Sequence, residues 1–236
     1  MIPSLLCLSL ASQAGASCTE DAMIVFDASG SMAEMGYNGL DEPRIIEARV
    51  AMHTVLPDVA PLRRLGLVTY GPGENSYCEN VKLRMPPQAD AAGPILQVVD
   101  TIEPSGNTAL TDAVRDASEV LGGGQVPGTV VLITDGKETC GGAPCQLAAQ
   151  LAGTGITVHV IGFRVRADFF NWEGGDAAPE IDRVPTVARC LADATEGVYV
   201  SAESLDELIT ALRQTLGCNF FSALPQTRAQ RGPIQR

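Results

Sequence analysis

The sequence has 236 residues, of which 45% are hydrophobic and 19% charged, and this size and composition are typical of one globular domain. Asp and Glu outnumber Lys and Arg by 28 to 16, giving a formal net charge of -12, which disfavours binding to nucleic acid because that needs a basic surface. Only two histidines are present, His53 and His159, each in an apolar-periodic segment. This argues against a His-rich zinc site and a Ser-His-Asp triad, and His159 is interpreted as a core or interface residue.

The N-terminal segment has features of a secretory signal peptide. Residues 2–11 form an apolar run far shorter than the roughly 20 residues that cross a bilayer, and small residues at positions 14–16 follow it. We therefore expect residues 1–16 to be a signal peptide cleaved after Ala16, although no Lys or Arg precedes the run. Acylation of Cys18 as a lipoprotein is the alternative, but the sequence lacks the large aliphatic residue such a site prefers.

Cysteine usage supports export. Removal of the signal peptide takes away Cys7 and leaves six cysteines, an even number that permits complete pairing. We expect a secreted or periplasmic protein whose mature chain has no transmembrane segment. The six remaining cysteines are Cys18, Cys78, Cys140, Cys145, Cys190 and Cys218.

Short apolar runs rich in β-branched residues recur along the chain and predict buried strands. Such runs are expected when both faces of a sheet are covered, so these strands should be parallel and central. A further segment, residues 81–85, alternates polar with apolar residues soon after a strand and predicts an antiparallel edge strand. The predicted central strands are residues 23–26, 65–70, 130–133, 157–161 and 198–200.

Amphipathic helical patterns separate these strands. The first begins at Pro43 and is expected to end before Pro57, and the second spans residues 110–121 before three glycines. The last follows a capping box made by Ser204 and Glu207. The alternation predicts an α/β fold, a doubly wound, Rossmann-like and mostly parallel six-stranded sheet with one antiparallel edge strand and helices on both faces.

Two segments lie outside this pattern. Residues 164–182 form a long polar loop at the carboxyl edge of the sheet, and its aromatic residues Phe169, Phe170 and Trp172 either anchor the loop or form an exposed binding patch. The tail, residues 219–236, contains three Arg and no acidic residue and is expected to be disordered.

Three separated segments place oxygen-bearing side chains where a doubly wound sheet brings them together. The first predicted strand ends in Asp27, Ser29 and Ser31, Thr108 enters a helix, and Asp135 follows a central strand. A carboxylate with several hydroxyls suits a hard divalent cation. The alternative is structural, in which Asp27 and the serines cap the following turn and Thr108 caps its helix.

The segments VFDASGSM, GNTALTDAV and VVLITDG strongly resemble the von Willebrand factor type A domain with a complete metal-ion-dependent adhesion site (MIDAS), over residues 20–217. The Cys-Gly-Gly-Ala-Pro-Cys turn at residues 140–145 is most similar to bacterial exported members. The resemblance implies that Ser29 and Ser31 bind the ion directly and that Asp27 acts through water. It also implies that Thr108 and Asp135 bind directly or through water, depending on the state of the site.

The donor set suggests the ion and its use. Hydroxyls are neutral, weak ligands, so the cation keeps much of its charge and attracts an acidic side chain from a partner. Mg²⁺ fits best, and Mn²⁺ or Ca²⁺ are alternatives.

The cysteines raise a question of pairing that spacing alone does not settle. Cys18 precedes the first strand and Cys218 ends the last helix, both at the sheet edge away from the metal, so we predict that they are bonded. This bond would limit the slide of the last helix that accompanies ligand binding in switching relatives. The short spacing of Cys140 and Cys145 favours a local bond, and Cys78 and Cys190 would then pair, stay free or belong to a shuffled arrangement.

These observations predict a metal-dependent protein-binding module and not an enzyme, because the local carboxylates belong to the metal shell and no general base is evident. One alternative is a scaffold subunit of a cell-envelope assembly. Another is a metal-dependent phosphohydrolase in which Asp27 attacks phosphate.

Overall fold

The computed structural model describes residues 20–35, 42–73, 78–165 and 188–217. The predicted signal peptide, the tail, the Cys18–Cys218 bond and the aromatic residues of the 164–182 segment lie outside these ranges. Among the helices of the described ranges, none combines the length and apolar character that a membrane span requires.

The core of the domain is a six-stranded sheet in the order β3-β2-β1-β4-β5-β6, in which only β3 runs antiparallel. This confirms the predicted doubly wound sheet with one antiparallel edge strand. The central strand β1 pairs with β2 on one side and with β4 on the other. The strands are β1 Asp21–Asp27, β2 Leu65–Tyr70, β3 Lys82–Gln88, β4 Gly128–Thr134, β5 Ile156–Phe163 and β6 Tyr199–Ala202.

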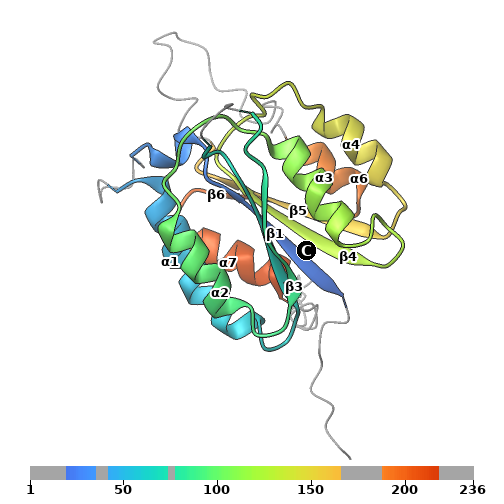
Figure 1. Ribbon diagram of the computed structural model, residues 1–236, viewed down its shortest axis with the longest axis horizontal. Helices are drawn as coiled ribbons and strands as arrows, with labels where there is room; N and C mark the ends of the chain where they lie inside the picture. The colour runs from blue at the N-terminus through green and yellow to red at the C-terminus, as the bar shows by residue number, and fades with distance from the viewer. Residues whose placement is uncertain (1–19, 36–41, 74–77, 166–187, 218–236) are drawn as a thin grey trace, which may run out of the picture.

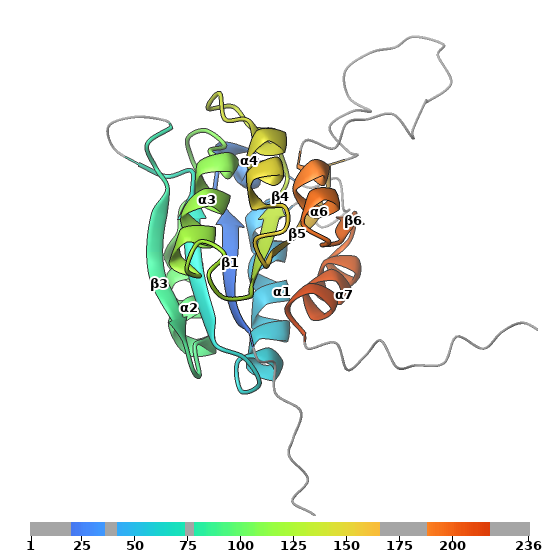
Figure 2. The same ribbon diagram turned by 90° about the vertical axis from the view of Figure 1, so that its right-hand side faces the viewer.

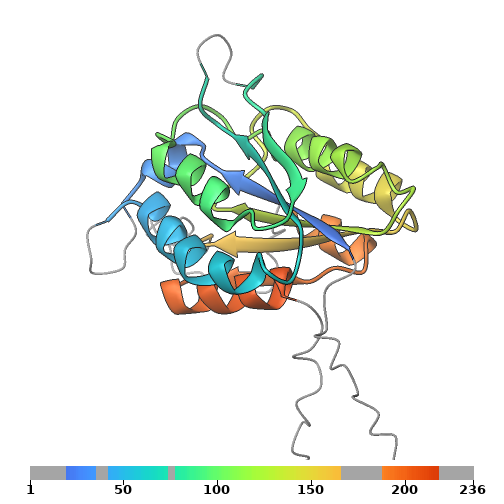
Figure 3. The same ribbon diagram turned by 60° about the horizontal axis from the view of Figure 1, so that its bottom comes forward.

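Helices cover both faces of the sheet (Figure 1). One layer contains α1 (Arg44–Val59), α2 (Ala92–Thr101) and α7 (Leu205–Leu216), with α1 and α7 side by side (Figure 3). The other layer contains α3 (Leu110–Val120), α4 (Pro144–Leu151) and α6 (Arg189–Ala194).

Alternate residues of β1 supply the two cores. Ile24 and Phe26 pack in the core under α1 and α7, whereas Met23 and Val25 pack in the core under α3 and α4. All four side chains are fully buried. Burial on both faces explains why the strand is apolar throughout and does not alternate with polar residues.

The helix ends differ in part from the sequence prediction. Pro57 lies inside α1, which continues to Val59, so the prediction that Pro57 ends the helix was wrong. Pro57 is exposed, so water can satisfy the carbonyl that loses its partner. At α7 the Ser204 half of the predicted capping box is confirmed, because the Glu207 N–H donates to Ser204 Oγ at 3.3 Å, while the Glu207 carboxylate accepts the Glu203 N–H at 2.7 Å.

The disulfides of the described residues are Cys78–Cys140 and Cys145–Cys190. The local Cys140–Cys145 bond favoured by spacing was therefore wrong. Cys145 lies in the first turn of α4, and Cys190 lies in the neighbouring helix α6. Cys140 precedes that helix and lies against the loop between β2 and β3, so the two nearby cysteines have different neighbours.

Candidate metal centre

The predicted site lies at the carboxyl ends of β1 and β4, two adjacent parallel strands in the middle of the sheet (Figure 2). Asp27 is the last residue of β1, and Asp135 directly follows β4. From β1 the strand order proceeds to β2 on one side and to β4 on the other. Such a switch point leaves a crevice at the carboxyl edge, where doubly wound folds place their sites.

Asp27 is fully buried, and neighbouring donors fix the orientation of its carboxylate. Its Oδ1 accepts the Ser29 N–H at 2.8 Å, which turns the chain directly after the strand. Its Oδ2 accepts the Thr134 hydroxyl at 2.7 Å, and Thr134 Oγ1 in turn accepts the Tyr70 hydroxyl at 3.1 Å. Burial, together with the negative charge of Asp27, raises the pKa of Tyr70 well above its usual value, so Tyr70 remains a donor.

The turn after Asp27 brings two serine hydroxyls close to Asp135. Ser29 precedes the short 3-10 helix η1 (Gly30–Ala33), whose second residue is Ser31. The two Oγ atoms lie 3.1 Å apart, and Ser31 Oγ donates to Asp135 Oδ1 at 2.6 Å. The β1 segment and the β4 segment thus meet through their side-chain oxygens. The structural alternative therefore holds for Asp27, which caps the turn through the Ser29 N–H, but not for Ser29, which makes no side-chain cap to η1.

Thr108 reaches the same place from the segment between α2 and α3. The Gly30 N–H donates to the Gly106 carbonyl at 3.0 Å, which joins this segment to the serine turn. A Cβ built on Gly136 would lie 3.6 Å from Ser31 Oγ and 3.8 Å from Thr108 Oγ1. Both hydroxyls therefore lie within 4 Å of one point beside Asp135. The cap residue of α3 is Ala109, so Thr108 is not the helix cap that the structural alternative supposed.

Arg44 is a site residue that the sequence analysis missed. Its guanidinium, in the first turn of α1, donates through Nη1 to Asp135 Oδ2 at 2.9 Å, and both side chains are buried. The exposed Glu34 carboxylate lies 3.7 Å from the same Nη1. The only sequence signal was a basic residue at the start of a helix, where acidic residues are usual.

The electrostatics of the site favour a cation. Burial and the nearby Asp27 charge raise the pKa of Asp135 to about 7, although Ser31 and Arg44 act in the opposite direction. Two carboxylates in a buried place gain from added positive charge. Among the described residues, no group of three or more His, Cys, Asp or Glu side chains is placed to hold a metal ion. A cation here would therefore depend on hydroxyl ligands, and the three hydroxyls and two carboxylates present are hard donors that suit Mg²⁺.

Sequence comparison finds a similarity over the part of the chain that contains these residues. A family model described as von Willebrand factor type A domain matches residues 22–138. The uncharacterized protein YwmC of Bacillus subtilis (strain 168) is 31% identical over an alignment of 147 residues, and the match covers 59% of this chain and 64% of that protein. The chain thus spans less than two thirds of the length of this curated relative.

Solved structures share the fold. An aerotolerance-related membrane protein from Bacteroides fragilis superposes with a TM-score of 0.60 at 19% identity, over 84% of this chain and 98% of that chain. The vWF domain of the type V pili tip protein Mfa5 from Porphyromonas gingivalis gives 0.58 at 13% identity, over 91% and 97%. Proximal thread matrix protein 1 from the mussel byssus, with a zinc-occupied MIDAS motif, gives 0.55 at 20% identity, over 86% and 46%.

Residues 22–138 thus match the model of the von Willebrand factor type A domain, and the described residues share the fold of these solved structures.

Proposed function

We propose that this protein is a divalent-metal-dependent protein-binding module that engages an acidic side chain of its partner through a MIDAS cation. The proposed ligand set is Asp27, Ser29, Ser31, Thr108 and Asp135. The observation that carries the proposal is the convergence of side-chain oxygens from three distant segments at one end of the sheet.

The geometry supports distinct roles for the ligands. Both Asp27 oxygens already accept hydrogen bonds, which suits a residue that orients water around the cation. The Ser29 and Ser31 hydroxyl oxygens lie 3.1 Å apart, which suits direct contact of both with one cation. When bound, the cation would supply a partly neutralised positive charge that attracts a carboxylate from outside. We propose Mg²⁺ as the ion, with Mn²⁺ or Ca²⁺ as substitutes, and the zinc-occupied MIDAS of the mussel protein supports the divalent class.

A binding role also accounts for the local chemistry better than hydrolysis does. A nucleophilic Asp27 would need a free oxygen facing the substrate, but the residue is fully buried and both of its oxygens are engaged. The histidines are used elsewhere: His53 pairs with Asp100 on the surface, and His159 Nδ1 accepts the Val198 N–H. We therefore propose that the protein is not an enzyme.

Export is part of the proposal. Two disulfides within the described residues support a secreted or periplasmic location, because such bonds persist in oxidising compartments. The similarity to the vWF domain of a pilus tip protein also supports a bacterial exported type.

Isothermal titration with magnesium chloride tests the ligand set. The wild-type protein should bind Mg²⁺, and the Ser29→Ala, Asp135→Ala double variant should lose that heat, because a direct hydroxyl ligand and a carboxylate are removed. Ser118→Ala is a matched control, since Ser118 is also buried but its hydroxyl donates to the Val114 carbonyl inside α3. Equal heats from the wild type and the double variant would refute the assigned ligands.

Affinity capture from a cell-envelope extract, with and without EDTA, tests the use of the cation. The proposal expects a protein partner that is released by EDTA and is not captured by the double variant. Assembly that is insensitive to chelation would instead support a scaffold role, and metal-dependent turnover of a phosphoester would support the hydrolase.

A further inference from the structure

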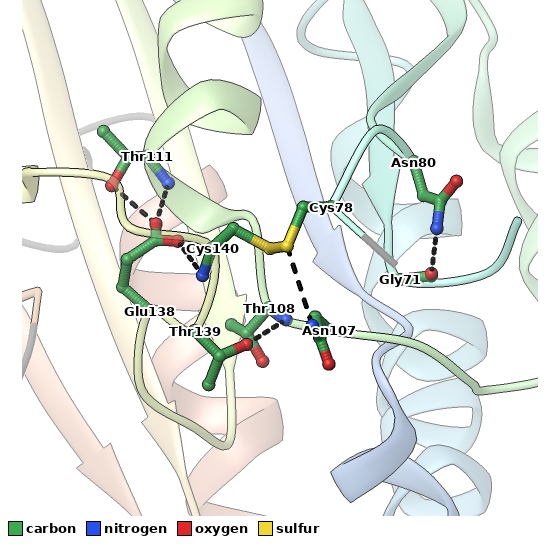
Figure 4. Close-up of a disulfide and its surroundings, with 9 residues drawn as sticks. All are labelled: Gly71, Cys78, Asn80, Asn107, Thr108, Thr111, Glu138, Thr139 and Cys140. Carbon is green, nitrogen blue, oxygen red and sulfur yellow. Dashed lines mark hydrogen bonds between the residues drawn. A yellow bond between two sulfur atoms is a disulfide. The ribbon is translucent and has the colours of Figure 1, made fainter. Parts of the chain in front are cut away.

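Three loops meet above Thr108, and one disulfide connects two of them. The Cys78–Cys140 bond joins the loop between β2 and β3 to the loop after β4. The third loop, between α2 and α3, contributes Asn107, whose Nδ2 donates to Cys78 Sγ at 3.6 Å (Figure 4). The disulfide therefore lies directly against the residue that precedes Thr108.

The residue beside Cys140 holds the backbone of Thr108 from both sides. The Thr108 N–H donates to Thr139 Oγ1 at 2.8 Å, and the Thr139 N–H donates back to the Thr108 carbonyl at 3.0 Å. Both polar groups of the Thr108 backbone are thus bonded to a single residue of the β4 loop. A shift of Cys140 would be transmitted directly to Thr108.

Glu138 ties the same loop to the start of α3. Its Oε2 accepts the Thr111 N–H at 2.9 Å and the Thr111 hydroxyl at 2.6 Å, while its Oε1 accepts the Cys140 N–H at 2.9 Å (Figure 4). A carboxylate at the N-terminus of a helix is favourable because it meets unsatisfied N–H groups and the positive end of the dipole. The helix that follows Thr108 is thereby fixed relative to Cys140.

The second disulfide provides a natural comparison. Cys145–Cys190 joins α4 to α6 in one helical layer, and its sequence separation of 45 is similar to the 62 of Cys78–Cys140. In the chain-entropy description, the two bonds therefore restrain the unfolded chain to a similar extent. Only Cys78–Cys140 adjoins the hydrogen bonds that hold Thr108.

We propose that the Cys78–Cys140 disulfide, with Thr139 and Glu138, forms a clamp that holds Thr108 in its metal-facing position. The cation affinity of the site then depends on this disulfide and not on Cys145–Cys190. This inference rests on the proposed function for its effect on metal affinity, but the clamp itself consists of protein contacts that involve no cation.

Two double variants test the clamp, Cys78→Ser with Cys140→Ser and Cys145→Ser with Cys190→Ser. In the presence of EDTA, hydrogen exchange of the peptide covering residues 105–111 should be about tenfold faster or more in the first pair than in the second. Magnesium affinity by titration should fall about ten- to a hundredfold in the first pair and stay within about twofold of the wild type in the second.

A milder variant keeps the test decisive if the first pair does not fold. Thr139→Val leaves both disulfides intact and removes the acceptor of the Thr108 N–H. It should speed exchange of the Thr108 amide and weaken magnesium binding by about two- to tenfold. Thr101→Val is the matched control, because the Thr101 hydroxyl bonds only within the end of α2.

The outcomes separate the clamp from the metal site. Equal exchange and equal magnesium affinity in both disulfide pairs would overturn the clamp. Absence of magnesium binding in the wild-type protein would overturn the proposed function, while the exchange rates in EDTA would still decide the clamp.

Discussion

Substitution of Arg44 by Met should destabilise the metal-free domain and increase its response to Mg²⁺. Arg44 and Asp135 form a buried pair at 2.9 Å, with side chains 1% and 0% exposed. Removal of one partner from a buried ion pair costs about 3–5 kcal/mol, because the other charge is left uncompensated. Arg44 also lowers the pKa of Asp135, so its loss favours the protonated carboxyl and places the expected cost at the lower end of this range near pH 7.

A cation at the proposed site would replace the missing positive charge. The free energy of unfolding, measured by guanidinium chloride titration in EDTA and in excess magnesium chloride, should therefore rise more in Arg44→Met than in the wild type. Each tenfold gain in cation affinity adds about 1.4 kcal/mol when the site is saturated. Arg44→Lys keeps the charge, so its magnesium-dependent gain in the free energy of unfolding should lie between those of the wild type and Arg44→Met.

Arg164→Met is the matched control for this experiment. Arg164 donates two hydrogen bonds of 2.7 Å to Glu47, which lies in α1 as Arg44 does. Both side chains of this pair are buried, as they are in the pair of Arg44 and Asp135. Arg164→Met should lose a similar amount of stability but gain no extra stabilisation from Mg²⁺, because neither Arg164 nor Glu47 belongs to the proposed ligand set. If Mg²⁺ stabilises Arg44→Met and Arg164→Met equally, the cation does not take over the role of Arg44 in balancing the charge of Asp135.

Three further changes probe the surroundings of the site. Burial, with a smaller effect of Arg63, lowers the pKa of His159 from 6.5 to about 4. As the pH falls from 6.5 to about 4, the His159 imidazole therefore takes up a proton only in the unfolded chain, which lowers the stability of the fold. The wild type should lose up to about 3 kcal/mol more than His159→Gln between pH 7.5 and pH 4.5 in denaturant titrations, and identical losses would contradict this. Gly106→Ala should cost about 1–3 kcal/mol in thermal unfolding, because Gly106 has a φ of +72° and a Cβ there would lie 2.2 Å from the Gly71 carbonyl oxygen; an unchanged melting temperature would contradict the packing. Tyr70→Phe should cost about 1 kcal/mol in chemical unfolding, since Thr134 Oγ1 loses its buried donor, and an unaltered midpoint would show that the hydroxyl contributes nothing.

The sheet and the edge at which the candidate residues meet were predictable from sequence for one physical reason. Residues buried on both faces of a parallel strand are apolar, so the strands appear as continuous runs, and a polar residue at the end of such a run must lie at the carboxyl edge. Asp27 and Asp135 each follow such a run directly. The structure brings these two residues together with Ser29, Ser31 and Thr108, although their role as metal ligands remains a prediction.

The features that sequence did not reveal depend on tertiary neighbours. Helix α2 contains Gly93 and Pro94 near its start, which hide a helical pattern although Pro is tolerated in a first turn. Cys140 and Cys145 are close in sequence, but one faces the loop between β2 and β3 and the other faces α6. Similarly, Arg44 reads as an ordinary surface cation until α1 is packed against Asp135.

Arg44 also bears on how tightly the proposed cation would be held. The Arg44 guanidinium balances the charge of Asp135, and Thr134 orients Asp27, so groups of the protein itself hold both carboxylates. Because these contacts need no cation, we expect the domain to fold without metal, unlike small domains whose metal binding supplies the folding energy. The same positive charge repels an incoming cation, so part of its attraction to the two carboxylates is lost. We therefore expect that the ion would exchange readily with the surroundings, and that the occupancy of the proposed site would follow the free magnesium concentration around the protein.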